Sequence, residues 1–169
     1  IALLAIKIED LKDFTSKLLL QPVFDEFSVA QAEIVTGTTI VIDGHINAAF
    51  YDTDECVYSD GSPRNFAYWS ELRETCLQRI RGKKLPLSFL ISLMLTPAQQ
   101  REIFSEDADS DLFAAVENFY FNLRYDSNGL IGMTGASYRT FTMNKLAEQS
   151  FERYITDFLQ TNDIAFLIL

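Results

Sequence analysis

The sequence has few of the residues on which several classes of protein depend. Its 169 residues include two cysteines, four prolines, seven glycines and one histidine. Two cysteines cannot form the set of bridges that holds small secreted domains together, and a chain of this length can bury a full core without bridges. Because 48% of the residues are apolar and 13% are aromatic, a disordered or low-complexity chain is also excluded.

Basic residues and long apolar runs are scarce as well. The 14 Lys and Arg residues are outnumbered by 24 Asp and Glu residues, which gives a net charge of −10. General nucleic-acid binding needs cations that neutralise phosphates, so this class is excluded. No apolar run reaches the roughly 18 residues of a membrane span, and the opening segment lacks the basic leader of a signal peptide. We therefore expect a cytoplasmic protein that does not bind membranes.

Complete catalytic and metal-binding motifs are missing too. The sequence has no Gly-x-Ser-x-Gly, no Cys-x-x-Cys, no His-Glu-x-x-His and no phosphate-binding Gly-x-x-x-x-Gly-Lys-Ser/Thr. Alternating aspartates at Asp107, Asp109 and Asp111 resemble the start of a calcium loop. Leu112 and Asn118, however, occupy the positions that need Gly and a bidentate Glu. We expect no metal and no cofactor.

The apolar pattern of the first half predicts a strand over residues 2–8 and a helix capped by Asp10 and ended by Pro22 at the latest. The β-branched segment that follows predicts two strands joined at Asp43-Gly44, because Asp-Gly is a preferred hairpin turn. Thr36-Gly37 is a second turn or a bulge within a strand.

Further along, Ser62-Pro63 predicts the start of a helix that buries an aromatic-rich stripe and ends at a left-handed Gly82. An apolar strand is expected over residues 85–95. The segment 96–99, Thr-Pro-Ala-Gln, then predicts a capped short helix.

The last third predicts a hairpin, a helix and a final strand. Residues 116–125 alternate between apolar and polar side chains, and Asn128-Gly129 turns the chain into a partner strand over 130–141. A helix near 144–160 and a strand at 164–169 complete the chain. The terminal strand has no charge to protect an edge, so we expect it to be paired in the sheet or covered by a second copy in a homodimer.

The resulting order is β-α-β-β-α-β-α-β-β-α-β. It predicts a single α+β domain over residues 1–169, with a mainly antiparallel sheet backed by helices. The order βαββαβ, typical of ferredoxin-like folds, occurs twice with one strand shared. The residues themselves show no repeat.

Half of the basic residues fall in residues 61–101, and four of them form a cluster, the basic segment: Arg79, Arg81, Lys83 and Lys84. Cations at a helix C-terminus are favourable without any ligand, and the acidic loop around Asp52, Asp54 and Glu55 could pair with them. The alternative is a site for a small anion or an acidic protein.

A second candidate surface lies on the predicted hairpin. Tyr120, Asn122 and Arg124 share the polar face of one strand, and Ser137 and Arg139 lie in its partner. Antiparallel sheets commonly leave one face to solvent, and the alternative is a ligand-binding face.

Three stretches support a resemblance: Lys7 to Thr15, then residues 82–86 with Phe89, then Thr134-Gly135 with Ser137 and Phe141 to Met143. On the basis of these stretches, the chain resembles a family of proteins of similar length from anaerobic Firmicutes, which is classified as a domain of unknown function. The resemblance spans nearly the whole chain and implies one domain in a bacterial cytosol. It implies no activity, ligand or site residue.

Two functions remain after these exclusions. The first is a non-catalytic interaction or regulatory domain of unidentified partner, favoured because no catalytic motif is complete. The second is an enzyme that binds a small anionic metabolite at the basic segment and uses His45 or a carboxylate to carry a proton. A cleft that joins His45 to the basic segment would favour the enzyme.

Overall fold

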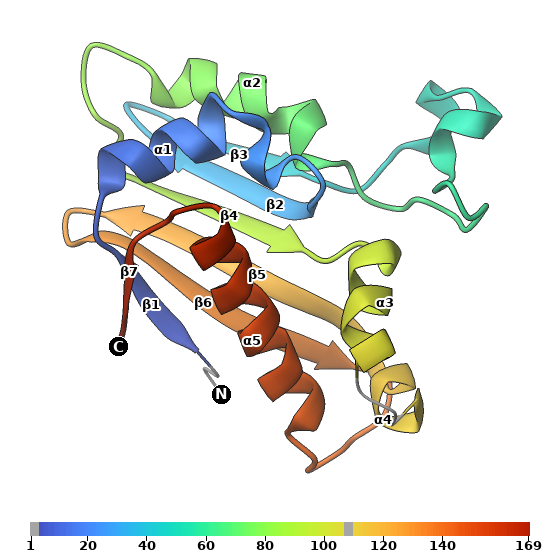
Figure 1. Ribbon diagram of the computed structural model, residues 1–169. Helices are drawn as coiled ribbons and strands as arrows, with labels where there is room; N and C mark the ends of the chain where they lie inside the picture. The colour runs from blue at the N-terminus through green and yellow to red at the C-terminus, as the bar shows by residue number, and fades with distance from the viewer. Residues whose placement is uncertain (1–3, 107–109) are drawn as a thin grey trace.

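The computed structural model describes residues 4–106 and 110–169, and it has the predicted α+β architecture (Figure 1). The predicted calcium-like loop includes Asp107 and Asp109, which lie outside the described residues. The elements are β1 (Ala5–Ile8), α1 (Leu11–Leu19), β2 (Ser28–Val35), β3 (Thr39–Asp43), α2 (Trp69–Ile80), β4 (Ser88–Met94), α3 (Pro97–Glu106), α4 (Ser110–Ala114), β5 (Val116–Asp126), β6 (Gly129–Tyr138), α5 (Leu146–Thr161) and β7 (Phe166–Ile168).

The strands form one antiparallel sheet in the order β3-β2-β4-β5-β6-β1-β7. The recurring element order is therefore present, but the strands are not paired as two ferredoxin-like units. Such a unit has its first and last strands side by side, whereas β1 pairs with β6 and β7, and β4 pairs with β2 and β5. Both βαββαβ stretches contribute to one continuous sheet.

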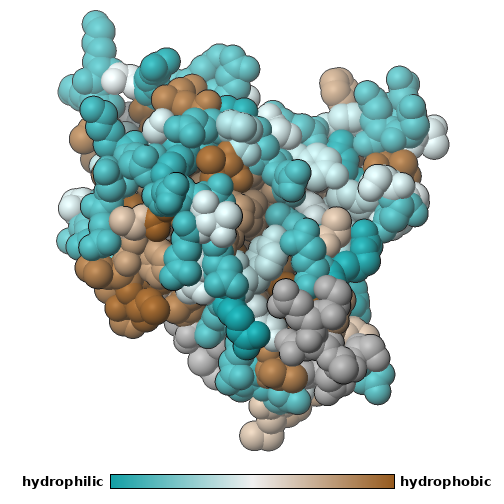
Figure 2. Space-filling model, viewed as in Figure 1, coloured by the Kyte–Doolittle hydropathy of each residue, from teal (hydrophilic) through white to brown (hydrophobic). Residues whose placement is uncertain are grey.

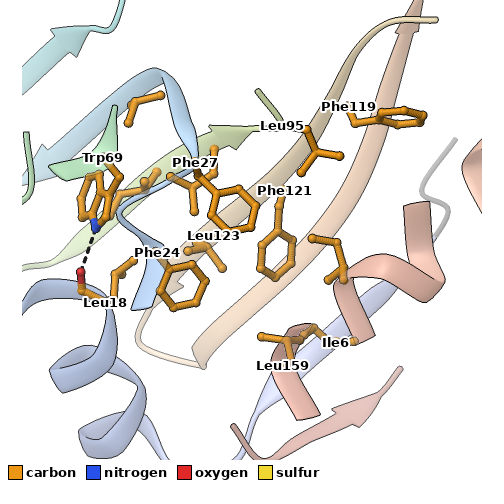
Figure 3. Close-up of a cluster of buried hydrophobic side chains, with 14 of the residues drawn as sticks. Ile6, Leu18, Phe24, Phe27, Trp69, Leu95, Phe119, Phe121, Leu123 and Leu159 are labelled. Carbon is orange, nitrogen blue, oxygen red and sulfur yellow. Dashed lines mark hydrogen bonds between the residues drawn. The ribbon is translucent and has the colours of Figure 1, made fainter. Parts of the chain in front are cut away.

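The helices α1, α2 and α5 cover one face of this sheet, and within residues 4–106 and 110–169 no helix lies on the other face (Figure 1). The core lies between the two layers and is rich in phenylalanine (Figure 3). Trp69 at the start of α2 is fully buried, and its Nε1 donates to the carbonyl oxygen of Leu18 at 2.8 Å. The predicted inward direction of Trp69 is thus confirmed, and this bond joins α2 to α1.

Several local predictions are confirmed at the level of single hydrogen bonds. The Asp10 carboxylate accepts from the backbone of Asp13 and caps α1. At the start of α3, the side chain of Gln99 accepts from the backbone of Thr96 at 2.9 Å. Gly129, with φ of +110°, reverses the chain between β5 and β6. Each of these signals depends only on neighbouring residues.

The predicted hairpin turn at Asp43-Gly44 is wrong. The chain turns near Gly37, between β2 and β3, and Gly44 follows the end of β3. Gly44 meets a different requirement, because a Cβ on it would lie 1.8 Å from the carbonyl oxygen of Val29. The glycine allows the chain to cross closely over β2.

The predicted start of α2 differs from the structure; its end falls at Gly82 as predicted, but without the left-handed conformation. Residues 63–68 are not helical: Phe66 forms a β-bridge with His45, and Val57 forms one with Pro63. Tertiary pairing with the preceding segment therefore outweighs the Ser-Pro start signal. At the other end, Arg81 closes the helix by donating its N–H to the carbonyl of Leu77 at 2.7 Å, and Gly82 has no positive φ.

Residues 46–63 form an arm that extends beyond the end of the sheet (teal and green in Figure 1). Its base is held by Arg64, a buried side chain that pairs with Glu71 and lies against the rings of Tyr51 and Tyr68. A second ion pair joins Arg101 of α3 to Asp60 at 2.9 Å. The arm is thus attached to both α2 and α3.

Among residues 4–106 and 110–169, no helix combines the length and the apolar character needed to cross a membrane.

Candidate functional site: the open face of the sheet

The face of the sheet that no helix covers, the open face, contains a hollow of about 990 Å³. Alternation along each strand sends one set of side chains into the core and the other set to this face. The hollow is lined by Ala30, Gln31, Val41, Asp43, His45, Leu90, Ser92, Asn122, Arg124, Ile131, Met133 and Thr134. Five of these twelve side chains are apolar, and the other seven carry polar or charged groups.

Two polar pairs lie within the hollow. Ser92 on β4 donates its hydroxyl proton to Oδ1 of Asn122 on β5, at 2.6 Å. At the end of β3, Nδ1 of His45 lies 2.6 Å from Oδ1 of Asp43. The backbone N–H of His45 and then its ring stabilise this carboxylate, which lowers the pKa of Asp43. The His45 ring also lies 4.4 Å from that of Phe66.

The Ser92–Asn122 and His45–Asp43 pairs are better suited to binding a ligand or partner than to nucleophilic catalysis. The Ser92 hydroxyl is directed to an amide oxygen, so His45 does not receive its proton. The His45 and Asp43 side chains are 65% and 74% exposed, so water solvates both of them. Within the described residues, no group of three or more His, Cys, Asp or Glu side chains could hold a metal ion.

One line of side chains crosses the whole open face, and we name it the charged row. The strand registers align, from β3 to β7, Val41, Glu33, Leu90, Arg124, Ile131, Lys7 and Leu167. Apolar and charged side chains alternate along it. Val41 and Leu167, at its two ends, are 57% and 53% exposed.

The residues predicted on β5 and β6 divide between two roles. The alternation of β5 is confirmed, and Arg124 and Asn122 line the hollow. Tyr120 is half-buried and lies beside Met94 of β4. Arg139 is structural, because its guanidinium donates to the carbonyls of Ala114 and Val116 at 3.2 and 3.0 Å and so holds the start of β5.

The basic segment lies at the opposite end of α2 from the acidic loop and from His45. Since α2 has 12 residues, these groups are separated by the length of that helix, about 18 Å. Arg79 donates to the hydroxyl of Thr38. In the described part of the chain, Arg81, Lys83 and Lys84 form no ion pair, so the internal pairing considered for them is not made.

Arg81 instead borders a mainly apolar groove of about 600 Å³ between α1, the end of α2 and the segment 85–86. This groove is separate from the hollow on the open face. A joint site of His45 and the basic segment, which the enzyme hypothesis requires, is not formed by this geometry.

No sequence pattern indicated that five members of the charged row lie on this face: Val41, Glu33, Leu90, Ile131 and Lys7. Alternation within one strand indicates which side chains share a face. It does not indicate which strands are neighbours, and β1 and β2 lie four strand steps apart in the sheet although they follow one another in the chain. Only the pairing order brings these residues into one line.

The structure thus defines an α+β domain with a one-sided antiparallel sheet and a mixed polar and apolar open face. The chain belongs to a family of unknown function, DUF5721, whose model matches residues 17–167. The searches of curated proteins and of solved structures found no match.

Proposed function

We propose that this protein is a non-catalytic interaction domain that docks another protein chain on the open face of its sheet. The observation that supports this proposal is the charged row: aliphatic side chains alternate with charges along it from β3 to β7, and no helix of the described residues covers it. Exposed apolar patches with polar surroundings are typical of interaction sites. In contrast, the outer surface of the helices is mostly hydrophilic (Figure 2).

The dimensions of the charged row favour a protein partner over a metabolite. It spans the full width of the sheet, about 30 Å at the usual spacing of strands. A small molecule would contact only the hollow and leave the β1 and β7 end of the row, Lys7 and Leu167, exposed. A bacterial, cytoplasmic setting is part of the same proposal, and the two free cysteines are compatible with a reducing compartment.

The test is photo-crosslinking in the cells that make the protein. A benzophenone amino acid replaces Met133 or Val41 on the open face and, as the control, Gln149, which is exposed on α5. We expect Met133 and Val41 to yield the same adduct and Gln149 to yield none. The absence of an adduct from both open-face positions, or the same adduct from all three positions, would contradict the proposal.

A further inference from the structure

We propose that the partner on the open face is a second copy of this chain, docked face to face about a two-fold axis that runs parallel to the strands and passes over β5. This inference rests on the proposed function and names the partner. It derives from the charged row, which has three residues on either side of Arg124. When one copy is rotated onto the other, the three residues on one side lie opposite the three on the other side, apolar to apolar and acidic to basic.

The strand β5 lies in the middle of the sheet, with three strands on either side. A two-fold axis over β5 brings each side of the row opposite the other side of its copy. Leu90 then lies opposite Ile131 of the copy, and Val41 lies opposite Leu167, so each apolar position of the row is placed opposite another apolar position. Between these positions, Glu33 of each copy faces Lys7 of the other copy, so the two-fold axis produces two such ion pairs.

The Glu33 and Lys7 side chains have no ion pair within the described part of their own chain. They cannot pair with each other in one copy, because four strand spacings, about 19 Å, separate β2 from β1. Opposite charges at symmetric positions, each without a partner, are what an isologous interface requires.

Arg124 falls on the axis, where two copies of the same cation would meet. The hollow extends from β3 to β6 and includes this position: Arg124, Leu90, Ile131 and Val41 belong to its lining, whereas Lys7, Glu33 and Leu167 lie outside it. Two such faces therefore touch first at their rims and enclose a central chamber, which gives the guanidinium groups room and water. Arg124 does not stabilise this contact.

The size of the face matches that of a stable interface. Six strand spacings give a width of about 30 Å, and the seven residues of β4 give a length of about 24 Å, so that each copy presents a face of about 700 Å² in projection, the hollow included. Stable interfaces bury about 800 Å² per partner. The charge of −10 on each copy opposes association over long distances, but at physiological salt the charges beyond about 8 Å are largely screened.

Charge reversal at the paired positions provides the test, with sedimentation equilibrium as the measurement. Lys7→Glu alone brings two pairs of like charges together, and so does Glu33→Lys, so we expect each variant to dimerise at least about tenfold more weakly than the wild type. An equimolar mixture of the two variants has complementary charges at both pairs and should form a heterodimer. The double variant Lys7→Glu/Glu33→Lys should dimerise again.

Lys12→Glu on α1 is the control, because Lys12 is exposed on the helix side and its reversal should leave the dimer unchanged. Arg124→Ala tests the axis itself: it removes two like charges that meet there, so it should not weaken the dimer. Thermal melts of all variants check that each one folds.

A wild type that stays monomeric, or single variants whose mixture does not associate, would overturn the dimer. The proposed function has an independent readout. If Met133 and Val41 then crosslink to one different protein, the interaction domain stands and only its partner is wrong. If they crosslink to nothing, the proposed function fails as well.

Discussion

The two cysteines differ in environment, and their chemistry should differ accordingly. Cys76 lies fully buried on the inner side of α2, and desolvation raises the pKa of its thiol to about 11. Cys56 is only half-buried and lies within the arm. Because the thiolate is the reactive form, Cys76 should resist modification in the folded protein.

Titration with Ellman's reagent at pH 8 checks this prediction. We expect one thiol per chain to react in the native protein and two to react in denaturant. In Cys56→Ser, the fast reaction should disappear. Two fast thiols in the native wild type would mean that α2 does not pack against the sheet as described.

At the same scale, the sequence predicted some members of the site and not others. The alternation of β5 was sufficient to direct Arg124 and Asn122 away from the core, because strand periodicity is a local property. His45 lines the same hollow, although the sequence placed it on a hairpin turn. Its position depends on the crossing at Gly44 and on the bridge to Phe66, which no local pattern encodes.

At the scale of the elements, the stability effect of a Cβ at Gly44, which lies against the backbone of β2, can be compared with its effect at Gly37, in the turn between β2 and β3. Gly44→Ala would force a methyl group onto the backbone of β2, so we expect a loss of about 3 kcal/mol in the free energy of unfolding. A Cβ at Gly37 meets nothing within 4 Å, and Gly37→Ala should change stability by less than about 1 kcal/mol.

Urea denaturation of both variants measures the difference. Equal effects would show that Gly44 does not cross over β2 and that the base of the arm is attached differently.

The same difference between the two glycines explains why the predicted hairpin turn at Asp43-Gly44 was wrong. Asp-Gly is a preferred turn because glycine adopts positive φ, but here glycine is needed because it lacks a Cβ.

Other elements were predictable to the extent that their signals were local. The cap of α1, the cap of α3 and the Asn-Gly turn of the β5–β6 hairpin were confirmed. The predicted helix start at Ser62-Pro63 was wrong, because Pro63, Phe66 and Tyr68 form β-bridges with Val57, His45 and Ser28. The neighbours of β1 and β4 in the sheet could not be predicted either, since the element order does not specify how strands pair.

For the whole molecule, the account makes the two sides of the sheet unequal in function. One side is closed by α1, α2 and α5 over a phenylalanine-rich core, and the other presents a row of charges and aliphatic side chains that complements its own copy. The basic segment and its groove lie outside this contact. A role of that segment in binding a small anion or an acidic protein stays a prediction, to be tested by an anion screen with Arg81→Ala.

The most direct measurement of the central claim is carbodiimide crosslinking of an equimolar mixture of ¹⁴N- and ¹⁵N-labelled protein, followed by mass spectrometry. Lys17 and Asp13, 2.8 Å apart in one chain, provide the internal control for the reaction and should crosslink without mixing of the labels. The account predicts a Lys7–Glu33 crosslink in which half of the peptide pairs carry one label of each kind. If the Lys17–Asp13 crosslink forms and no Lys7–Glu33 crosslink appears, the face-to-face dimer is contradicted.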